Sequence, residues 1–178
     1  SGMIVGAGSE SWTIARDACA RLPVHLAPPW LFARQQPIAV DDVIAALVRA
    51  LTLAPGSYDV PGPETLTGAE IVARVSRVLG RDARLVPIPF FPRALAGAIA
   101  PFVTRASGLV ARELFLGMGL DLTVDGEGVF RHMPDHRRVP FDEACARAIA
   151  ADAVPLAGQL VEAMLKRGQR RPRRAHAP

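Results

Sequence analysis

Short strand-like runs alternate with helix-forming stretches through the first half of the chain, and this order limits the available folds more than any other feature. Residues 3–5, 37–40 and 58–60 are such runs, and each soon leads into a stretch with helical periodicity. Residues 85–89 form a further extended run, whose prolines restrict it to a sheet edge. Strands that alternate with helices predict an α/β fold with a partly parallel sheet.

The first run is the most unusual because nothing in the sequence introduces it. Residues 3–5 reach a glycine-containing turn at 6–9 without a preceding turn or helix cap. We therefore expect them to be the end of a strand whose beginning is missing. Ser9 or Ser11 is then predicted to cap a helix that continues to Leu22.

Two further helix starts carry capping signals. Asp41 or Asp42 is predicted to cap the helix after the second run, and capping is preferred to acid/base catalysis because consecutive side chains diverge. Thr67 and Glu70 have the spacing of a capping box, and Gly80 stands where a left-handed cap ends the helix. Between them lies one apolar stripe, formed by Ile71, Val72, Val75, Val78 and Leu79.

The length and composition predict one ordinary domain with a terminal tail. The chain has 178 residues, of which 50% are hydrophobic, and this is enough to build a core. Further helices are expected at about 92–103, 106–118, from Pro140 onwards, and at 154–167.

Positive charge is concentrated at the C-terminus. Residues 166–178 hold six lysine and arginine side chains and no acid, so the remaining residues of this +4 chain carry a net −2. We interpret this segment as a disordered, solvated tail, with binding to phosphate or a membrane surface as the alternative. No basic face with interleaved aromatic residues occurs elsewhere, so nucleic acid is not an expected partner.

The cysteine content favours a reducing compartment. Cys19 and Cys145 are far apart in stretches that look helical, with Cys19 on a buried face, and two cysteines do not form a disulfide framework. The most apolar region, 85–120, is interrupted by prolines and arginines, so no run reaches the ~18–20 residues that span a bilayer. We therefore expect a cytoplasmic protein.

The N-terminal turn has some features of a chemical site. Gly6-Ala7-Gly8 follows a strand and precedes a helix, as a dinucleotide phosphate loop does, yet Ser11 stands where the third glycine belongs. A turn that needs small residues, or a pocket loop whose N–H groups face a ligand, also explains it. Ser9 and Ser11 lie outside any Gly-x-Ser-x-Gly motif, so capping is preferred to a nucleophilic role.

Two later segments offer weaker signals. His132 and His136 have the spacing of a metal-binding pair next to Asp135, but Pro134 interrupts the helix that this needs, so we expect a polar loop and no metal. Residues 87–92 form either the wall of an apolar ligand site or part of the core, and core packing is preferred. The apolar side chains in question are Pro87, Pro89, Phe90, Phe91 and Pro92.

Three stretches in combination resemble the C-terminal half of the atypical and extended short-chain dehydrogenase/reductases, the NAD(P)-dependent epimerase/dehydratase and NmrA-like group. They are residues 1–9, 36–43 and 58–67. The resemblance implies the C-terminal part of a Rossmann-like fold, with a partial parallel sheet and a mostly helical substrate-binding region. It implies a sheet remnant and substrate loop at 1–65 and a substrate-binding region at 66–165, followed by the tail at 166–178.

The same resemblance implies roles for individual residues. Gly2, Met3 and Ile4 correspond to positions near the nicotinamide of NAD or NADP. Gly6, Gly8 and Ser9 correspond to the substrate border. Arg34 stands roughly where many extended members hold a substrate-binding arginine, whose fork suits a phosphate or carboxylate.

The departures from this family are equally informative. The family's catalytic Tyr-x-x-x-Lys is absent, because the single tyrosine is Tyr58 and the lysine is Lys166. Its glycine-rich diphosphate loop is absent as well, so we expect no catalytic residue in this chain and no cofactor binding without a further half.

Two functions follow as hypotheses. The first is the substrate-binding part of an NAD(P)-dependent oxidoreductase or epimerase, acting on a small molecule and prone to form a homo-oligomer through its exposed sheet edge. The second is a non-catalytic interaction module or accessory subunit derived from the same fold.

Overall fold

The computed structural model of this protein describes residues 2–152 and has an α/β fold. Within that range three two-stranded sheets occur. Two are parallel: β1 (Ile4–Val5) with β4 (Ile38–Ala39), and β2 (His25–Ala27) with β6 (Leu85–Pro87). The third is antiparallel, β3 (Arg34–Gln35) with β5 (Leu66–Thr67). The expectation of an α/β fold with parallel pairing is confirmed, while the predicted helix at 154–167 and the basic tail lie outside the described residues.

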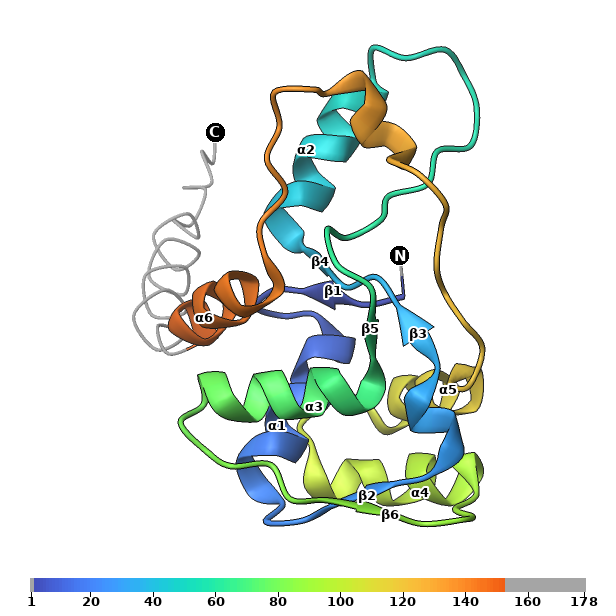
Figure 1. Cartoon of the computed structure of the whole chain (residues 1–178), viewed down its shortest axis with the longest axis vertical. Helices are drawn as coiled ribbons and strands as arrows, with labels where there is room; N and C mark the ends of the chain where they lie inside the picture. The colour runs from blue at the N-terminus through green and yellow to red at the C-terminus, as the bar shows by residue number, and fades with distance from the viewer. Residues whose placement is uncertain (1, 153–178) are drawn as a thin grey trace, which may run out of the picture.

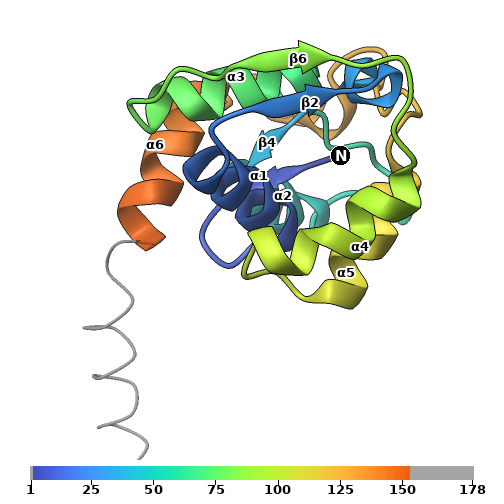
Figure 2. The ribbon, with the colours of Figure 1, turned by 90° about the horizontal axis from the view of Figure 1, so that it is seen from below.

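Helices surround the β1–β4 pair. The α-helices are α1 (Glu10–Arg21), α2 (Val40–Ala50), α3 (Gly68–Val78), α4 (Arg93–Val103), α5 (Gly108–Gly117) and α6 (Phe141–Asp152), and two 3₁₀ turns are η1 (Pro29–Phe32) and η2 (Gly128–His132). α2 lies above the β1–β4 pair in Figure 1 and α3, α1, α4 and α5 lie below it. Figure 2 shows β2 beside β6, with α4 and α5 packed together on the opposite side of α1. None of the helices between residues 2 and 152 is long and apolar enough to cross a membrane.

The capping signals at two helix starts are confirmed. Ser9 caps α1, with its hydroxyl accepting from the backbone N–H of Trp12. Thr67 and Glu70 form both halves of the capping box of α3, and Gly80 ends that helix at φ +70°.

The predicted cap of α2 is wrong. The helix begins directly from β4, so Ala39 occupies the N-cap position and neither Asp41 nor Asp42 supplies a capping oxygen. Both carboxylates lie in the first turn, where the helix dipole favours negative charge. The Asp42 side chain is instead buried, and its Oδ2 accepts a hydrogen bond from the backbone N–H of Val139 at 2.9 Å.

The predicted strand at 58–60 is absent. These residues have no strand partner, and Asp59 accepts a single backbone bond from Val129 N at 2.8 Å. Pro61 and Pro63 follow, and a proline cannot donate to a strand ladder. The segment therefore packs as an irregular strip beside η2.

The largest cluster of buried side chains draws on both halves of the sequence. It joins β1, α1, α3 and α6 around Trp12, which is fully buried. The other buried members include Met3, Val5, Cys19, Leu66, Ile71, Val75, Phe141 and Cys145. Residues from both sides of position 65 thus share one core.

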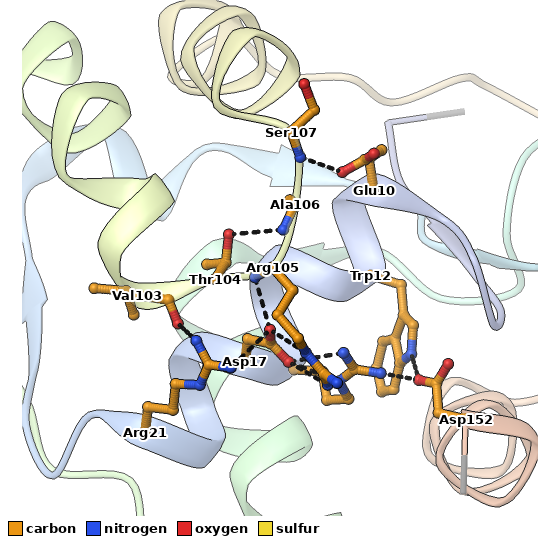
Figure 3. Close-up of polar contacts among 11 residues, drawn as sticks. Glu10, Trp12, Asp17, Arg21, Val103, Thr104, Arg105, Ala106, Ser107 and Asp152 are labelled. Carbon is orange, nitrogen blue, oxygen red and sulfur yellow. Dashed lines mark hydrogen bonds and ion pairs between the residues drawn. The ribbon is translucent and has the colours of Figure 1, made fainter. Parts of the chain in front are cut away.

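A buried carboxylate fastens α1 to its neighbours (Figure 3). Asp17 accepts from Arg16 Nη2 at 2.7 Å, from the backbone N–H of Arg105 at 2.9 Å and from Arg105 Nε at 3.2 Å. Nearby, Trp12 Nε1 donates to Asp152 at the end of α6 at 3.0 Å. Burial raises the pKa of Asp17, but the bonds from Arg105 and Arg16 outweigh it and lower that pKa to about 2. Each Asp17 oxygen is engaged, so this cluster is structural.

Candidate functional site

A glycine turn lies at the carboxyl end of β1 and leads into α1. The backbone N–H of Ser9 donates to Gly6 O at 3.1 Å, and Gly8 has φ +82°. A Cβ on Gly6 would lie 2.6 Å from Val40 Cγ1, so glycine is needed where the turn meets the start of α2. β1 and β4 are parallel, so their carboxyl ends meet at this edge, the edge at which open α/β sheets bind ligands.

The two serines of the turn have structural partners. Ser9 Oγ donates to Ile4 O at 2.8 Å and lies 3.1 Å from Ser11 Oγ. No basic side chain among residues 2–152 contacts either hydroxyl, so no described residue is placed to activate them as nucleophiles. Capping, the preferred role, is the role that Ser9 has.

The residues assigned to the nicotinamide side lie at the other end of β1. A Cβ on Gly2 would lie 3.1 Å from Gln35 Cβ and 3.2 Å from Leu122 Cβ. Met3 is buried in the main core, and Ile4 is half-buried and pairs with Ile38 of β4. The Met3 side chain thus faces the interior, and contact with a cofactor at this position is left to the backbone.

Arg34 lies at the surface with an acidic partner. Its side chain is 63% exposed, and its guanidinium forms an ion pair with Asp121 at 3.3 Å. The backbone N–H of Arg34 also donates to Asp121 Oδ1 at 2.8 Å, and this bond together with the guanidinium lowers the pKa of Asp121. An exposed pair of this kind is screened by solvent and adds little stability, so a ligand anion can compete for Arg34.

The segment 118–122 links Arg34 to an aromatic cleft. A Cβ on Gly119 would lie 3.0 Å from Trp30 Cβ, and Gly119 has φ +99°. Two residues on, Asp121 holds Arg34, and the backbone N–H of Leu122 donates to Arg34 O at 2.8 Å. Segment 118–122 therefore runs past Gly2, Arg34 and Trp30. Gly6, Gly8 and Ser9 lie at the opposite end of β1.

The cleft itself has a volume of about 650 Å³ and is mainly apolar. Trp30 Nε1 donates to Phe91 O at 2.7 Å, and the Trp30 ring packs edge-on against Phe115 at 6.1 Å. Arg93 lies at the rim and donates to the carbonyls of Leu116 and Met118 at the end of α5. The cleft is open to solvent over much of its extent, and its volume lies within the range of small-molecule sites.

The preferred interpretation of residues 87–92 as core is wrong. Phe90 is 77% exposed and lines the cleft together with Pro89, Phe91 and Pro92. The prolines keep the chain extended between β6 and α4, so it runs along the surface. Trp30, from a segment with no strong sequence signal, completes the cleft from the other side.

The histidines of the proposed polar loop have partners within the protein. His136 Nε2 lies 2.8 Å from Asp42 Oδ1, and the His132 ring contacts Tyr58 edge-on at 6.0 Å. No group of three or more candidate metal ligands occurs between residues 2 and 152.

The two thiols are buried and unreactive in character. Cys19 and Cys145 are both free and buried, and burial raises the pKa of each, that of Cys145 to about 12. A thiolate nucleophile is therefore not supported at either position.

Comparison with known proteins gives partial structural matches alone. No protein-family model matches the chain, and no curated protein matches it. Among solved structures it is similar to a predicted epimerase from Burkholderia cenocepacia, at 15% identity and a TM-score of 0.47. It is also similar to RMD from Pseudomonas aeruginosa in complex with NADPH (15%, 0.45) and to UDP-N-acetylglucosamine 4-epimerase from Bacillus cereus (17%, 0.39).

These matches are partial on both sides. They cover 84%, 84% and 68% of this chain, respectively, and 44%, 45% and 45% of the solved chains. This chain thus spans less than half the length of each structure that it resembles.

Proposed function

We propose that this chain forms the substrate-binding part of an NAD(P)-dependent oxidoreductase or epimerase-like protein and is not catalytically competent alone. The observation that carries the proposal is the parallel β1–β4 pair, in which a glycine turn and the start of α2 meet at the carboxyl edge. The sequence resemblance assigns the same turn, with Gly6, Gly8 and Ser9, to the substrate border.

A dinucleotide does not fit the described residues by themselves. Val40 fills the space beside Gly6, so a diphosphate has no close approach to the backbone there. The third glycine of a dinucleotide loop is also missing. Ser11 occupies its position, and the Ser11 hydroxyl contacts Ser9 and the Ile4 carbonyl. In the proposal, NAD or NADP is held by a separate half, and Gly2, Met3 and Ile4 only border its nicotinamide.

The surface around Arg34 lies at the Gly2 end of β1, opposite the glycine turn, and we take the substrate class from this surface. The aromatic cleft at Trp30 suits a flat apolar group, and Arg34 suits a carboxylate or phosphate on the same molecule. Because the Arg34–Asp121 pair is exposed, an anion replaces Asp121 at little cost.

NADPH binding tests the proposal. Fluorescence titration compares the 178-residue chain with the product of the complete reading frame that contains it. We expect no saturable binding to the 178-residue chain up to millimolar NADPH, and micromolar binding to the complete product. Tight binding to the 178-residue chain, or none to a longer product, contradicts the proposal.

A second function, a non-catalytic interaction module, is favoured by one observation. α2 exposes an apolar stripe at i, i+3, i+4 and i+7, and soluble monomers rarely expose such contiguous patches. The stripe consists of Ile44, Leu47, Val48 and Leu51, which are between 55% and 86% exposed. An accessory subunit would use this face to dock, and its test is the association experiment described in the Discussion.

A further inference from the structure

A second cavity, separate from the aromatic cleft, lies beside η2. It has a volume of about 510 Å³ and is lined by residues of η2 and of the following loop. η2 packs on α2 at the upper end of the molecule in Figure 1, away from α4 and α5. The cavity therefore lies apart from the aromatic cleft, and α2 is the element that it shares with the glycine turn.

Basic side chains dominate the charge of this cavity. Its charged lining consists of Arg131, Arg137 and Arg138 against Glu127, with His136 among them. Arg138 Nη2 pairs with Glu127 at 2.5 Å, which neutralises both. The two remaining guanidinium groups have no acidic partner among residues 2–152.

Arg131 and Arg137 both have unused hydrogen-bond donors. Arg137 makes no hydrogen bond or ion pair with any residue in the described part of the chain. Arg131 uses only its Nε, which donates to Gly128 O at 3.1 Å. Two guanidinium groups with free Nη donors match the oxygens of a phosphate, which accepts bidentate bonds from arginine.

The floor of the cavity is fixed by buried contacts. Phe130 is buried, the His136 ring stacks on it at 5.6 Å, and Arg138 lies 5.1 Å from its centroid. His136 is held from behind by Asp42, which is 1% exposed. Arg138 Nη1 also donates to Pro61 O and Gly62 O at 3.3 Å each. The wall beside the free arginines is thus preorganised and partly apolar.

We infer that this cavity binds a small organic phosphate, with Arg131 and Arg137 holding the phosphate group and the apolar surface of Met133 and Pro134 contacting the organic part. The volume accommodates a compact ligand of this kind. His136 has Nδ1 left as a further polar atom, because its Nε2 is engaged with Asp42.

Isothermal titration of the full chain with phenyl phosphate, inorganic phosphate and benzoate tests this inference. We expect phenyl phosphate to bind at least about fivefold tighter than either of the others. Equal affinity for phenyl phosphate and inorganic phosphate overturns the role of the apolar face. Equal affinity for phenyl phosphate and benzoate overturns the assignment to phosphate. A weak ligand has a Kd of about 1 mM, so the absence of phenyl phosphate binding at about 10 mM overturns the site.

Two arginine variants locate the site. Arg137→Ala removes an exposed side chain with no hydrogen bond or ion pair to other described residues, so we expect the fold to be retained and phenyl phosphate to bind about tenfold more weakly. Arg77→Ala on α3 is the matched control, since Arg77 is also exposed and its loss changes the net charge equally. An unchanged affinity in Arg137→Ala, or an equal loss in Arg77→Ala, contradicts the inference.

Discussion

The buried carboxylate of Asp42 lies 2.8 Å from Nε2 of His136, and this pair joins the first turn of α2 to the loop that precedes α6. Asp42 is 1% exposed, and its other oxygen accepts from the backbone N–H of Val139. A buried carboxylate is tolerated when both oxygens have partners, and here the partners come from one distant loop. The pair therefore fixes the position of His136 in the wall of the cavity beside η2.

Removal of the Asp42 carboxylate is expected to destabilise the fold. Asp42→Ala leaves the Val139 N–H and the His136 ring without their acceptor, at a cost of about 2–3 kcal/mol in the free energy of unfolding. The control is Asp41→Ala, because Asp41 is exposed and pairs with Arg147 at the surface, where a loss below about 1 kcal/mol is expected. Urea denaturation measures both, and equal losses would show that Asp42 is not a buried anchor.

The Asp17 cluster makes stability depend on acid. The pKa of Asp17 is about 2 in the folded protein and 3.8 in the unfolded chain, so the unfolded state takes up the proton first as the pH falls. Stabilisation from Asp17 is thus complete well above pH 3.8 and is lost as the pH falls from there towards 2. We expect Asp17→Asn to be less stable than wild type at pH 6. Between pH 5 and pH 2, its free energy of unfolding should fall by about 1–2 kcal/mol less than that of wild type. Parallel pH dependences would contradict this account.

The Gly6 turn is expected to be intolerant of a side chain. Gly6→Ala places a Cβ 2.6 Å from Val40 Cγ1, at a cost of about 1–3 kcal/mol in overpacking. The double variant Gly6→Ala/Val40→Ala makes room for the new methyl group, so the two changes should cost less together than their sum. Strict additivity in thermal or urea unfolding would rule out this contact.

Local signals predict the starts of α1 and α3 correctly, whereas contacts between distant segments are not predicted. Thr67, Glu70 and Gly80 act within their own helix, so their spacing alone reveals the capping box and the end of α3. The cap of α2 was assigned to an aspartate because aspartate is a common cap, but β4 runs straight into the helix and Asp42 is drawn to His136 instead.

The sequence predicts only those parts of the candidate sites that lie within one segment. The prolines and phenylalanines of residues 87–92 mark this segment in the sequence, but the cleft also needs Trp30, which comes from a segment far away in the chain. The pairing of β2 with β6 is also non-local, and strands of two or three residues carry too little periodicity to be recognised.

The apolar stripe on α2 is expected to drive association. Leu47→Glu places a charge in the middle of the stripe, where the side chain is 61% exposed, so stability should change by less than about 0.5 kcal/mol while self-association decreases. Leu109→Glu on α5 is the control, since Leu109 is also exposed but lies outside the stripe. Light scattering across a concentration series measures the effect. A monomeric wild type, or an equal response of both variants, would argue against self-association through α2.

The most direct test of the proposed function is the nucleotide sequence of the gene upstream of the codon for Ser1. If this chain is the substrate-binding part of an NAD(P)-dependent protein, the reading frame continues upstream and encodes a glycine-rich strand-to-helix turn followed by Tyr-x-x-x-Lys. An in-frame stop codon shortly upstream of the Ser1 codon, with no such sequence between, would contradict the account and make the chain a separate module.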